Sequence, residues 1–403
     1  MAKQSFFKHF NQVESLGGAL LFFAAIAAMI ISNTPLQAWY HNFFMNVHLS
    51  FGIGSLSIAE PIQYWINDGL MAIFFMLVGL EIKRELVVGE LSHWSNALLP
   101  LVAALGGIVV PAAIYLLVNK GYSEYLQGWA IPTATDIAFS LGVLSLLKSR
   151  IPTSLKTFLT ALAIIDDLGA IVVIAVFYTT GLSWLLVLAS FFCIMVLILF
   201  NRIGLMRFTP YAIVGFILWL CVLGSGIHAT LAGIALAFAY PLHDKSNHFH
   251  LPSRKIESYL HPWVVYVILP IFAFANAGVT LSRVTESSLY HPITLGIFAG
   301  LFFGKPLGIF IACWLAVKSK AVKLPNGVGF SMLYGVAILA GIGFTMSLFV
   351  GNLAFPVGNY HLMVKVGVFG ASLLSGIVGY WILRHVTAPQ RIAVRRIKKS
   401  KVP

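Results

Sequence analysis

The stretch TALAIIDDLGAIVVI, from Thr160 to Ile174, places two adjacent aspartates, Asp166 and Asp167, in the middle of an apolar run. The chain of 403 residues contains only 13 Asp and Glu residues in total. A charged side chain at the centre of a membrane helix costs roughly 2.5–3.5 kcal/mol on the insertion scale. Since two adjacent charges would cost about twice as much, we interpret the pair as functional rather than structural.

The composition of the chain indicates a membrane protein. Hydrophobic residues make up 59% of it and charged residues 10%, whereas an ordinary soluble domain is about 25% charged. Apolar windows of about 20 residues, long enough to cross a bilayer as helices, recur from end to end. We therefore predict an all-α polytopic membrane protein. Because no polar segment is long enough to form a globular domain, we expect a single transmembrane domain over residues 1–403.

The Lys and Arg residues fall in alternate connections between the apolar stretches. They give the chain a net charge of +13, and their largest group is the tail over residues 387–403. This alternation is the positive-inside pattern, which predicts that the basic connections and both termini are cytoplasmic. The tail can also contact anionic lipid. Charges distributed in this way orient a membrane protein and do not indicate a nucleic-acid partner.

The apolar stretches between these connections predict twelve transmembrane helices. We expect them near residues 15–34, 61–82, 97–119, 127–147, 153–178, 182–201, 209–223, 225–241, 259–281, 292–317, 329–351 and 361–386. One external connection, VHLSFGIGSLSI from Val47 to Ile58, alternates apolar and small polar residues around two glycines and predicts a β-hairpin. This hairpin, over about residues 45–58, either mediates a homodimer or lies on its own bundle.

The fourth and eleventh predicted spans contain residues that interrupt a helix. These residues are Pro132, Thr133, Thr135 and Asp136 in the fourth span, and Gly341, Gly343 and Thr345 in the eleventh. Unwound backbone at membrane depth is tolerated only where it is buried in protein or lines a wet cavity. The two breaks are seven spans apart, an odd number, so the second is inverted relative to the first. Spans 3–5 and 10–12, over about residues 97–178 and 292–386, are therefore candidates for an inverted repeat with two crossing interrupted helices.

Four ionisable side chains remain at mid-depth once the connections are removed: Asp136, Asp166, Asp167 and Lys305. Adjacent residues on a helix point about 100° apart, so one of the paired aspartates can approach Lys305 while the other faces a cavity. Where two interrupted helices cross, Asp136 can balance the positive helix ends and Lys305 the negative ones. Carboxylates, the Thr135 hydroxyl and freed carbonyls make an oxygen-only shell suited to a hard cation.

Neither the cysteines nor the loop histidines indicate a cofactor. The three cysteines show no metal-ligand spacing. We interpret His243, His248 and His250 as solvated loop residues rather than a metal site. The glycines spaced four apart before and after Lys305, from Gly296 to Gly308, predict a ridge of small residues along which a neighbouring helix packs closely.

The chain closely resembles the NhaA-type sodium/proton antiporters over essentially its whole length, from Phe10 to about Ala388. The motifs that carry the resemblance are IIDDLGA, PTATDIAFSLG, FFGKPLG, GIGFTMSLF, LEIKREL, GIHATLAG and LPIFAFANAG. The resemblance implies that Asp167 is the more direct ligand of Na⁺ or Li⁺ and that Asp166 is the partner of Lys305. It implies that Thr135 and Asp136 belong to the extended chain of the fourth span.

The resemblance also implies residues that sense pH. These are Glu81, Arg84, Glu85 and Glu257, with Arg254, Lys255 and His261 nearby, and His228, which matches a position linked to pH response. From the residues alone, we interpret His228 instead as a histidine whose ring is satisfied at a helix end.

The function expected is therefore that of a secondary antiporter in the bacterial inner membrane, not of an enzyme. It would export Na⁺ or Li⁺ in exchange for H⁺ by alternating access, with protons and cation competing for the buried aspartates. The resemblance implies electrogenic, pH-regulated transport without a cofactor. Two alternatives remain open: proton-coupled uptake of an organic substrate, which needs a roomier cavity, and an intramembrane hydrolase, which needs two aspartates that face each other.

Overall fold

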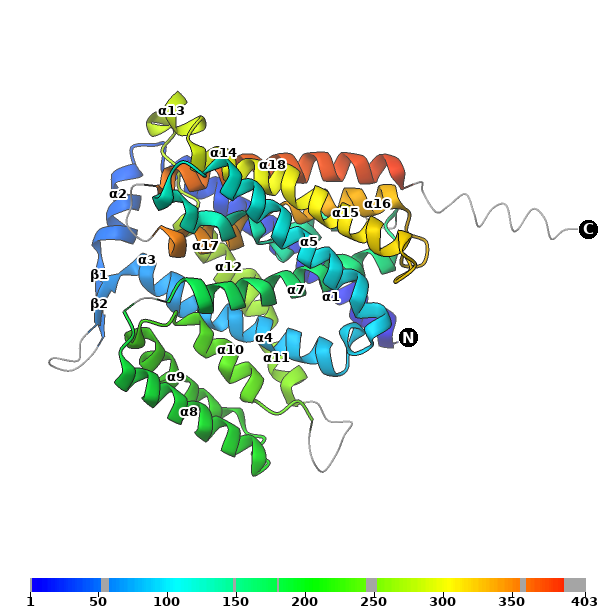
Figure 1. The fold of residues 1–403 in the computed structure, drawn as a ribbon. Helices are drawn as coiled ribbons and strands as arrows, with labels where there is room; N and C mark the ends of the chain where they lie inside the picture. The colour runs from blue at the N-terminus through cyan, green and yellow to red at the C-terminus, as the bar shows by residue number, and fades with distance from the viewer. Residues whose placement is uncertain are drawn as a thin grey trace, which may run out of the picture.

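The computed structural model describes residues 2–51, 58–147, 150–179, 181–243, 252–355 and 360–387, and these form a bundle of helices (Figure 1). The first half contains α1 (Ala2–Ile31), α2 (Gln37–His41), η1 (Asn42–Asn46), β1 (His48–Phe51), β2 (Ile58–Pro61), α3 (Ile62–Tyr64), η2 (Trp65–Leu70), α4 (Met71–Val87), η3 (Glu90–Ser92), α5 (Trp94–Val118), η4 (Ser123–Thr133), α6 (Ile137–Ser145), α7 (Thr153–Phe177) and α8 (Trp184–Arg202). The second half contains α9 (Phe208–Ser225), α10 (Thr230–Ala239), α11 (Pro252–Trp263), η6 (Val264–Ile268), α12 (Leu269–Asn276), η7 (Leu281–Arg283), α13 (Glu286–Leu289), α14 (Pro292–Ala299), η8 (Gly300–Gly304), α15 (Lys305–Lys318), α16 (Phe330–Ala340), α17 (Phe344–Ala354) and α18 (His361–Val386). The η elements are short 3₁₀ or π segments.

Each of the twelve stretches predicted to span the membrane contains helix. Among the described residues, eight helices are long and apolar enough to cross a membrane, and the bent pair of α16 and α17 makes a ninth. Leu16–Ile31 within α1 and Thr230–Ala239 in α10 are apolar but shorter. The protein is thus a helical, multi-pass membrane protein.

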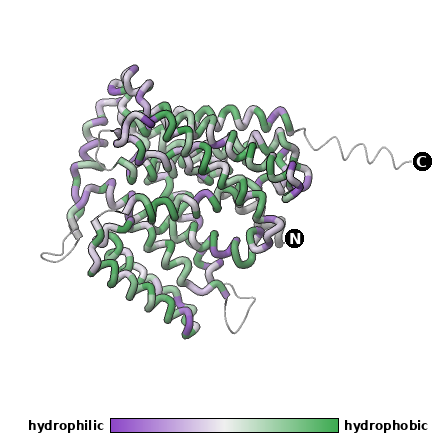
Figure 2. Tube along the Cα trace, in the orientation of Figure 1, coloured by the Kyte–Doolittle hydropathy of each residue, from purple (hydrophilic) through white to green (hydrophobic). Residues whose placement is uncertain are grey.

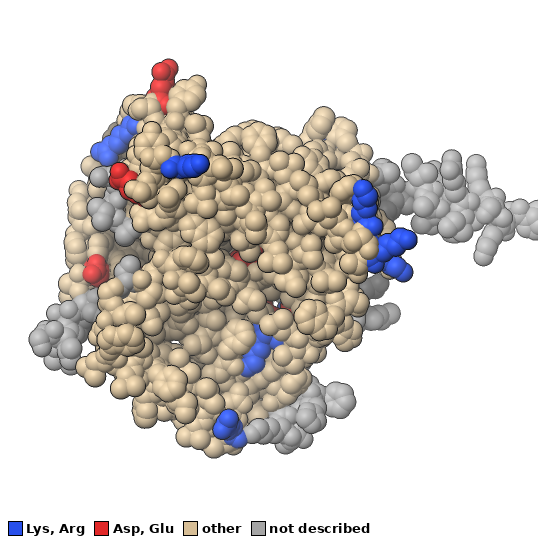
Figure 3. All heavy atoms as spheres, in the orientation of Figure 1, with Lys and Arg blue, Asp and Glu red and all other residues tan. Residues whose placement is uncertain are grey.

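The surface of the bundle suits a lipid environment. Hydrophobic residues run along the helices, whereas hydrophilic residues gather at the connections (Figure 2). The outer faces of α8 and α9 expose large apolar side chains such as Leu185 and Phe192. On the face drawn in Figure 3, the Lys, Arg, Asp and Glu side chains lie mostly toward the two ends. An uncharged band between charged ends is what a bilayer requires.

The predicted hairpin is present, with a different second boundary. Strands β1 and β2 pair antiparallel, with His48 opposite Pro61 and Phe51 opposite Ile58. The second strand thus begins where the prediction ended, and it continues to Pro61. Residues 52–57, which include Gly52 and Gly54, lie outside the described residues. Trp65 holds the hairpin to the bundle, because its Nε1 donates to the carbonyls of Leu49 and Glu60 at 3.1 and 3.2 Å.

The fourth span, expected near residues 127–147 with an interruption at Pro132 to Asp136, is interrupted there. Its first part is the 3₁₀ helix η4, which ends at Thr133; residues 134–136 are extended, and α6 follows. Pro132 has no N–H to donate, and the Thr133 hydroxyl donates back to the Ala130 carbonyl at 2.8 Å. The eleventh span breaks at residues 341–343, where α16 and α17 meet at a bend of 45°.

The predicted ridge of glycines packs against α5 and η4. A methyl group on Gly308 would lie 2.1 Å from the Gly106 carbonyl oxygen, and one on Gly304 would lie 2.9 Å from Pro111. Gly300 faces Pro132 in the same way. The preceding π segment, η8, accommodates Pro306, which cannot donate into a regular helix. This close packing places Lys305 beside α5 and the end of η4.

Candidate functional site

The two helix breaks lie against each other, and polar groups of one span bond the freed carbonyls of the other. The Asp136 N–H donates to the Ile342 carbonyl at 2.7 Å. The Thr135 hydroxyl donates to Ala340 at 2.9 Å, that of Ser140 to Leu339 at 3.0 Å and that of Ser347 to Ile131 at 2.8 Å. A broken helix leaves such carbonyls without partners, and bilayer lipid cannot supply any. The crossing is therefore held by donors from both interrupted spans.

The Asp136 carboxylate caps the N-termini of both α6 and α17. Its Oδ1 accepts the Phe139 N–H at 2.9 Å, and its Oδ2 accepts the N–H and hydroxyl of Thr345 at 3.1 and 2.5 Å. A carboxylate at a helix N-terminus satisfies free N–H groups and balances the positive end of the helix dipole. We expected Asp136 to balance the positive ends of the interrupted helices, and this is confirmed. Both of its carboxylate oxygens accept hydrogen bonds at helix N-termini.

Lys305 lies at only one of the two carbonyl ends. Its Nζ donates to the Thr133 carbonyl at the end of η4, and it forms an ion pair with Asp166 Oδ2 at 2.8 Å. At the end of α16 the donors are instead the hydroxyls of Thr135 and Ser140. The expectation that Lys305 balances both negative ends is thus correct for the fourth span and wrong for the eleventh, because neutral hydroxyls reach the second end.

The two adjacent aspartates of α7 have different surroundings. Asp166 is 2% exposed, and its Oδ2 accepts from Lys305 and from the Thr135 hydroxyl at 2.8 Å. Asp167 is 1% exposed, and its Oδ2 has no hydrogen-bond partner in the part of the chain that the structure describes. The pairing expected between Asp166 and Lys305 is present. Asp166 Oδ1 is likewise buried without a partner among the described residues, so the two aspartates differ in that Asp166 contacts Lys305 whereas Asp167 lines the cavity described next.

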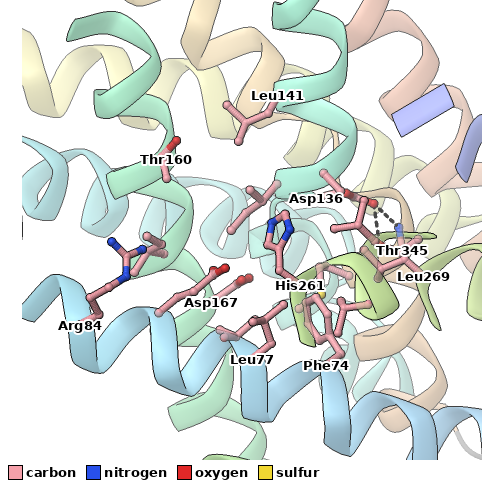
Figure 4. A pocket seen from close by; sticks show the side chains of 18 residues that line it. Phe74, Leu77, Arg84, Asp136, Leu141, Thr160, Asp167, His261, Leu269 and Thr345 are labelled. Carbon is pink, nitrogen blue, oxygen red and sulfur yellow. Dashed lines mark hydrogen bonds between the residues drawn. The ribbon is translucent and has the colours of Figure 1, made fainter. Parts of the chain in front are cut away.

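Asp167 lines a cavity of about 90 Å³ (Figure 4). The polar residues of its wall are Glu81, Arg84, Asp136, Thr160, Asp167, His261 and Thr345. The Arg84 side chain is 32% exposed, so the cavity leads from a partly exposed residue to a buried carboxylate. Since a water molecule occupies about 30 Å³ in the liquid, the cavity has room for roughly three. Thr135, Asp166 and Lys305 lie behind this wall and do not line the cavity.

Most of the predicted pH-sensing residues gather at the partly exposed end of this cavity. Arg84 Nε lies 3.1 Å from both carboxylate oxygens of Glu257, and Arg84 Nη1 lies 2.7 Å from Glu85. Glu81 and His261 line the cavity with Arg84. Arg254 and Lys255 are exposed on α11, within a turn of Glu257. Helices α4 and α11 thus bring one charged cluster to the cavity.

His228 is not part of that cluster. It lies between α9 and α10, packs against Phe349, and places its Nε2 3.4 Å from Asp68 Oδ1. Sequence reasoning missed Asp68, a fifth buried acid or base within the spans, which is 8% exposed in η2. Its signal was available, since Asp68 stands inside the stretch predicted to span the membrane at 61–82.

Sequence reasoning also missed a cluster of amides. Asn276 accepts from Gln63 at 3.0 Å and from Asn352 at 2.9 Å, and it donates to Asn67 at 2.9 Å and to the Phe272 carbonyl at 3.0 Å. This amide cluster joins α3, η2, α12 and α17. The sequence gives no signal for this cluster, because single amides in different spans form no local pattern.

The other sequence predictions concern residues that the structure describes in part. His248, His250 and the tail from residue 388 lie outside the described residues. Among the described residues, no group of three or more His, Cys, Asp and Glu is placed to hold a metal ion. The polar groups that the structure brings together are instead the carboxylate, hydroxyl and carbonyl oxygens at the helix crossing and on the cavity wall.

Interrupted helices that cross around buried carboxylates, inside a bundle of membrane-spanning helices, define a secondary ion transporter. Residues 8–383 match the family model described as Na+/H+ antiporter 1. The chain therefore belongs to the Na+/H+ antiporter 1 family, and it is a transporter rather than an enzyme.

Similar proteins agree with this assignment over nearly their full length. The Na(+)/H(+) antiporter NhaA 1 of Pseudomonas putida is 52% identical over 392 residues, which cover 97% of this chain and 98% of that protein. The Na(+)/H(+) antiporter NhaA of Psychrobacter arcticus is 50% identical, covering 93% and 94% of the two chains. That of Tolumonas auensis is 49% identical, covering 98% of each.

Proposed function

We propose that this protein exports Na⁺ or Li⁺ in exchange for H⁺ by alternating access. The observation that carries the proposal is Asp167, a buried aspartate that lines the cavity and whose Oδ2 has no hydrogen-bond partner among the described residues. Such an oxygen binds either a proton or a small hard cation, and the two exclude each other. Binding of Na⁺ to Asp167 thus releases a proton, and binding of a proton releases Na⁺.

Asp166 has a second role in this proposal. Its Oδ2 pairs with Lys305 and lies 2.8 Å from the Thr135 hydroxyl, whose single proton is shared between Asp166 and the Ala340 carbonyl. When a cation or a proton reaches Asp166, the ion pair with Lys305 weakens, so the two aspartates and Lys305 titrate as one coupled group. If more than one proton of this group moves per cation, transport is electrogenic.

The finer architecture follows from the same proposal. The nine candidate spans, with Leu16–Ile31, Thr230–Ala239 and the interrupted pair of η4 and α6, would make twelve. The chain would then have both termini on the cytoplasmic side of a bacterial inner membrane. In support, α1 begins and α18 ends at the end of the bundle opposite β1 and β2 (Figure 1). Spans 3–5 and 10–12 would form an inverted repeat, since their breaks face each other at the crossing.

Regulation by pH would act at the mouth of the cavity. Arg84, Glu85 and Glu257 form a paired cluster there, and Glu81 lies between that cluster and Asp167 on the cavity wall. Titration of the cluster changes the charge at the entrance without altering the ligands of the cation. His228, beside Asp68, is a second candidate for pH response.

The hairpin of β1 and β2 is the proposed homodimer contact, and the basic segments are proposed to contact anionic lipid. No cofactor is required.

The geometry favours this function over the two alternatives. A cavity of about 90 Å³ fits a small cation with a few waters and is too small for most organic substrates, whose pockets measure about 300–1,000 Å³. An aspartyl hydrolase needs two carboxylates free to share a substrate. Both oxygens of Asp136 are engaged at helix N-termini, so Asp136 and Asp167 do not make such a pair.

The test is Na⁺-dependent collapse of a proton gradient in everted membrane vesicles. We expect the wild type to collapse the gradient when Na⁺ or Li⁺ is added, and Asp167→Asn to abolish this response while the protein remains folded in the membrane. Glu124→Gln, a change at an external residue that does not line the cavity, serves as the control. A wild type without Na⁺-dependent exchange, or an active Asp167→Asn variant, would refute the proposal.

A further inference from the structure

One helix face carries both Asp167 and a residue that sequence reasoning missed, Thr160. Thr160, Ile164 and Asp167 all line the cavity from α7. Their spacing of four and three residues places them on the same face of the helix. Since a helix rises about 1.5 Å per residue, Thr160 lies about 10 Å from Asp167 along the helix axis. Figure 4 shows both side chains on this helix, with Arg84 near the same end of the cavity.

The Thr160 hydroxyl differs from the other hydroxyls near the site because it is not engaged. Thr345 donates to Asp136 at 2.5 Å, and Thr135 is fully buried between Asp166 and Ala340. Thr157 on the same helix donates to the Thr153 carbonyl at 3.1 Å, and Thr179 just after the helix donates to the Ala175 carbonyl at 2.8 Å. Within the described residues, Thr160 makes no hydrogen bond through its side chain.

A cation that enters this cavity needs oxygen ligands before it reaches Asp167. Since Asp167 is 1% exposed, a cation beside it gives up most of its hydration waters. The remaining ligands must come from the wall, where Leu77, Val78, Leu141 and Ile164 offer none. Besides the carboxylates, the wall offers a neutral hydroxyl oxygen at Thr160 and at Thr345, and the Thr345 hydroxyl already donates to Asp136. A neutral hydroxyl can replace a water ligand, and it binds a cation more weakly than a second carboxylate would. The cation can therefore both enter and leave the cavity.

We propose that Thr160 is a further cation ligand of this transporter. Its hydroxyl oxygen replaces a hydration water of Na⁺ or Li⁺ between the mouth of the cavity and Asp167. This inference rests on the proposed function, and it assigns to Thr160 the neutral-oxygen role in the cavity that sequence reasoning gave to Thr135. Thr160 sets the affinity for the cation and not the rate of the conformational change, because it contacts the ion and not the crossing.

The test substitutes Thr160→Val, which keeps the shape of the side chain and removes only the hydroxyl. We expect the apparent KM for Na⁺ in everted vesicles to rise about three- to tenfold, the range that corresponds to the loss of one neutral hydrogen-bonding contact. The maximal rate at saturating Na⁺ and the pH of half-maximal activity stay unchanged. Thr160→Ser, which restores the hydroxyl, returns the KM to within twofold of the wild type.

The matched control is Thr157→Val on the same helix. Thr157 is exposed, does not line the cavity and already donates to Thr153, so its loss leaves the KM unchanged. The inference is overturned if Thr160→Val keeps the wild-type KM, if Thr160→Ser behaves like valine, or if only the melting temperature and maximal rate fall. A wild type without Na⁺-dependent exchange would instead overturn the proposed function.

Discussion

Two polar clusters lie inside this apolar bundle, and they differ in how completely their groups are paired. In the amide cluster, Asn276 accepts two hydrogen bonds and donates two, so its side chain is fully used. In the aspartate site, Asp166 Oδ1 and Asp167 Oδ2 are buried without a partner in the described part of the chain. An unpaired buried acceptor costs about 1–3 kcal/mol, and more when it is charged. The amide cluster, whose groups are paired, holds helices together. The unpaired oxygens of the aspartate site are available to bind and release a ligand.

The largest effect is expected from breaking the ion pair between Asp166 and Lys305, the charged contact inside the aspartate site. Asp166→Asn removes the carboxylate that faces Lys305 and leaves a buried ammonium without its counter-charge. We expect the free energy of unfolding to fall by about 3–5 kcal/mol. Thermal unfolding in detergent, followed by fluorescence, measures the loss.

Asp167→Asn is the matched control for this prediction, since it is the adjacent residue, equally buried, and has no ammonium at hydrogen-bonding distance. Its melting temperature should stay within a few degrees of the wild type. Equal losses of stability in the two variants would contradict the division of roles between the aspartates.

A second change breaks the amide cluster. Asn276→Leu keeps the number and branching of the side-chain heavy atoms but leaves the side chains of Gln63, Asn67 and Asn352 without their shared partner. We expect a loss of about 2–3 kcal/mol in the free energy of unfolding, because some of these groups find other partners. The apparent KM for Na⁺ in the folded protein should be unchanged. A raised KM with normal stability would show instead that the amide cluster belongs to the ion pathway.

The smallest expected effect is at the mouth of the cavity. Glu257→Gln removes the carboxylate that Arg84 contacts through two oxygens and makes the mouth more positive. Protons then bind less readily there, so we expect the pH–activity profile to move to lower pH by about half a unit to one unit. The KM for Na⁺ at the optimal pH should change less than twofold.

Glu90→Gln is the control for that shift, because Glu90 contacts Asn96 away from the cavity wall. Transport is assayed across a pH series for both variants. A profile that does not move in Glu257→Gln, or that moves equally in Glu90→Gln, would remove Glu257 from the regulatory cluster.

Much of the fold and of the site could be predicted from the sequence because the signals are local. Proline and glycine indicated both helix breaks, and the 100° step between adjacent helical residues separated Asp166 from Asp167. The four-residue spacing of glycines predicted the packing that holds Lys305. Each of these depends only on residues near one another in the chain.

What could not be predicted depends on contacts between distant spans. The extended backbone after Thr133 brings the Thr135 hydroxyl to Asp166 and to the Ala340 carbonyl, two partners that lie far from it in the sequence. Thr160 looked like any helix residue until the cavity was seen. The amides that meet Asn276 come from three other elements. Their pairing follows from the packing of whole helices, which no short segment specifies.

The contact between Gly106 and Gly308 has a consequence for how the family's sequences can vary. Any side chain at Gly308 would meet the backbone of α5 at about the length of a hydrogen bond or less, so neither position tolerates even alanine without moving a helix. Gly169 on α7 likewise packs against Ile108 of α5, where a methyl group would lie 2.7 Å from that side chain. Lys305 and Asp166 are thus carried by two helices that both rest on α5. Three positions with no side chain, none of which touches an ion, fix the distance between the charges that do.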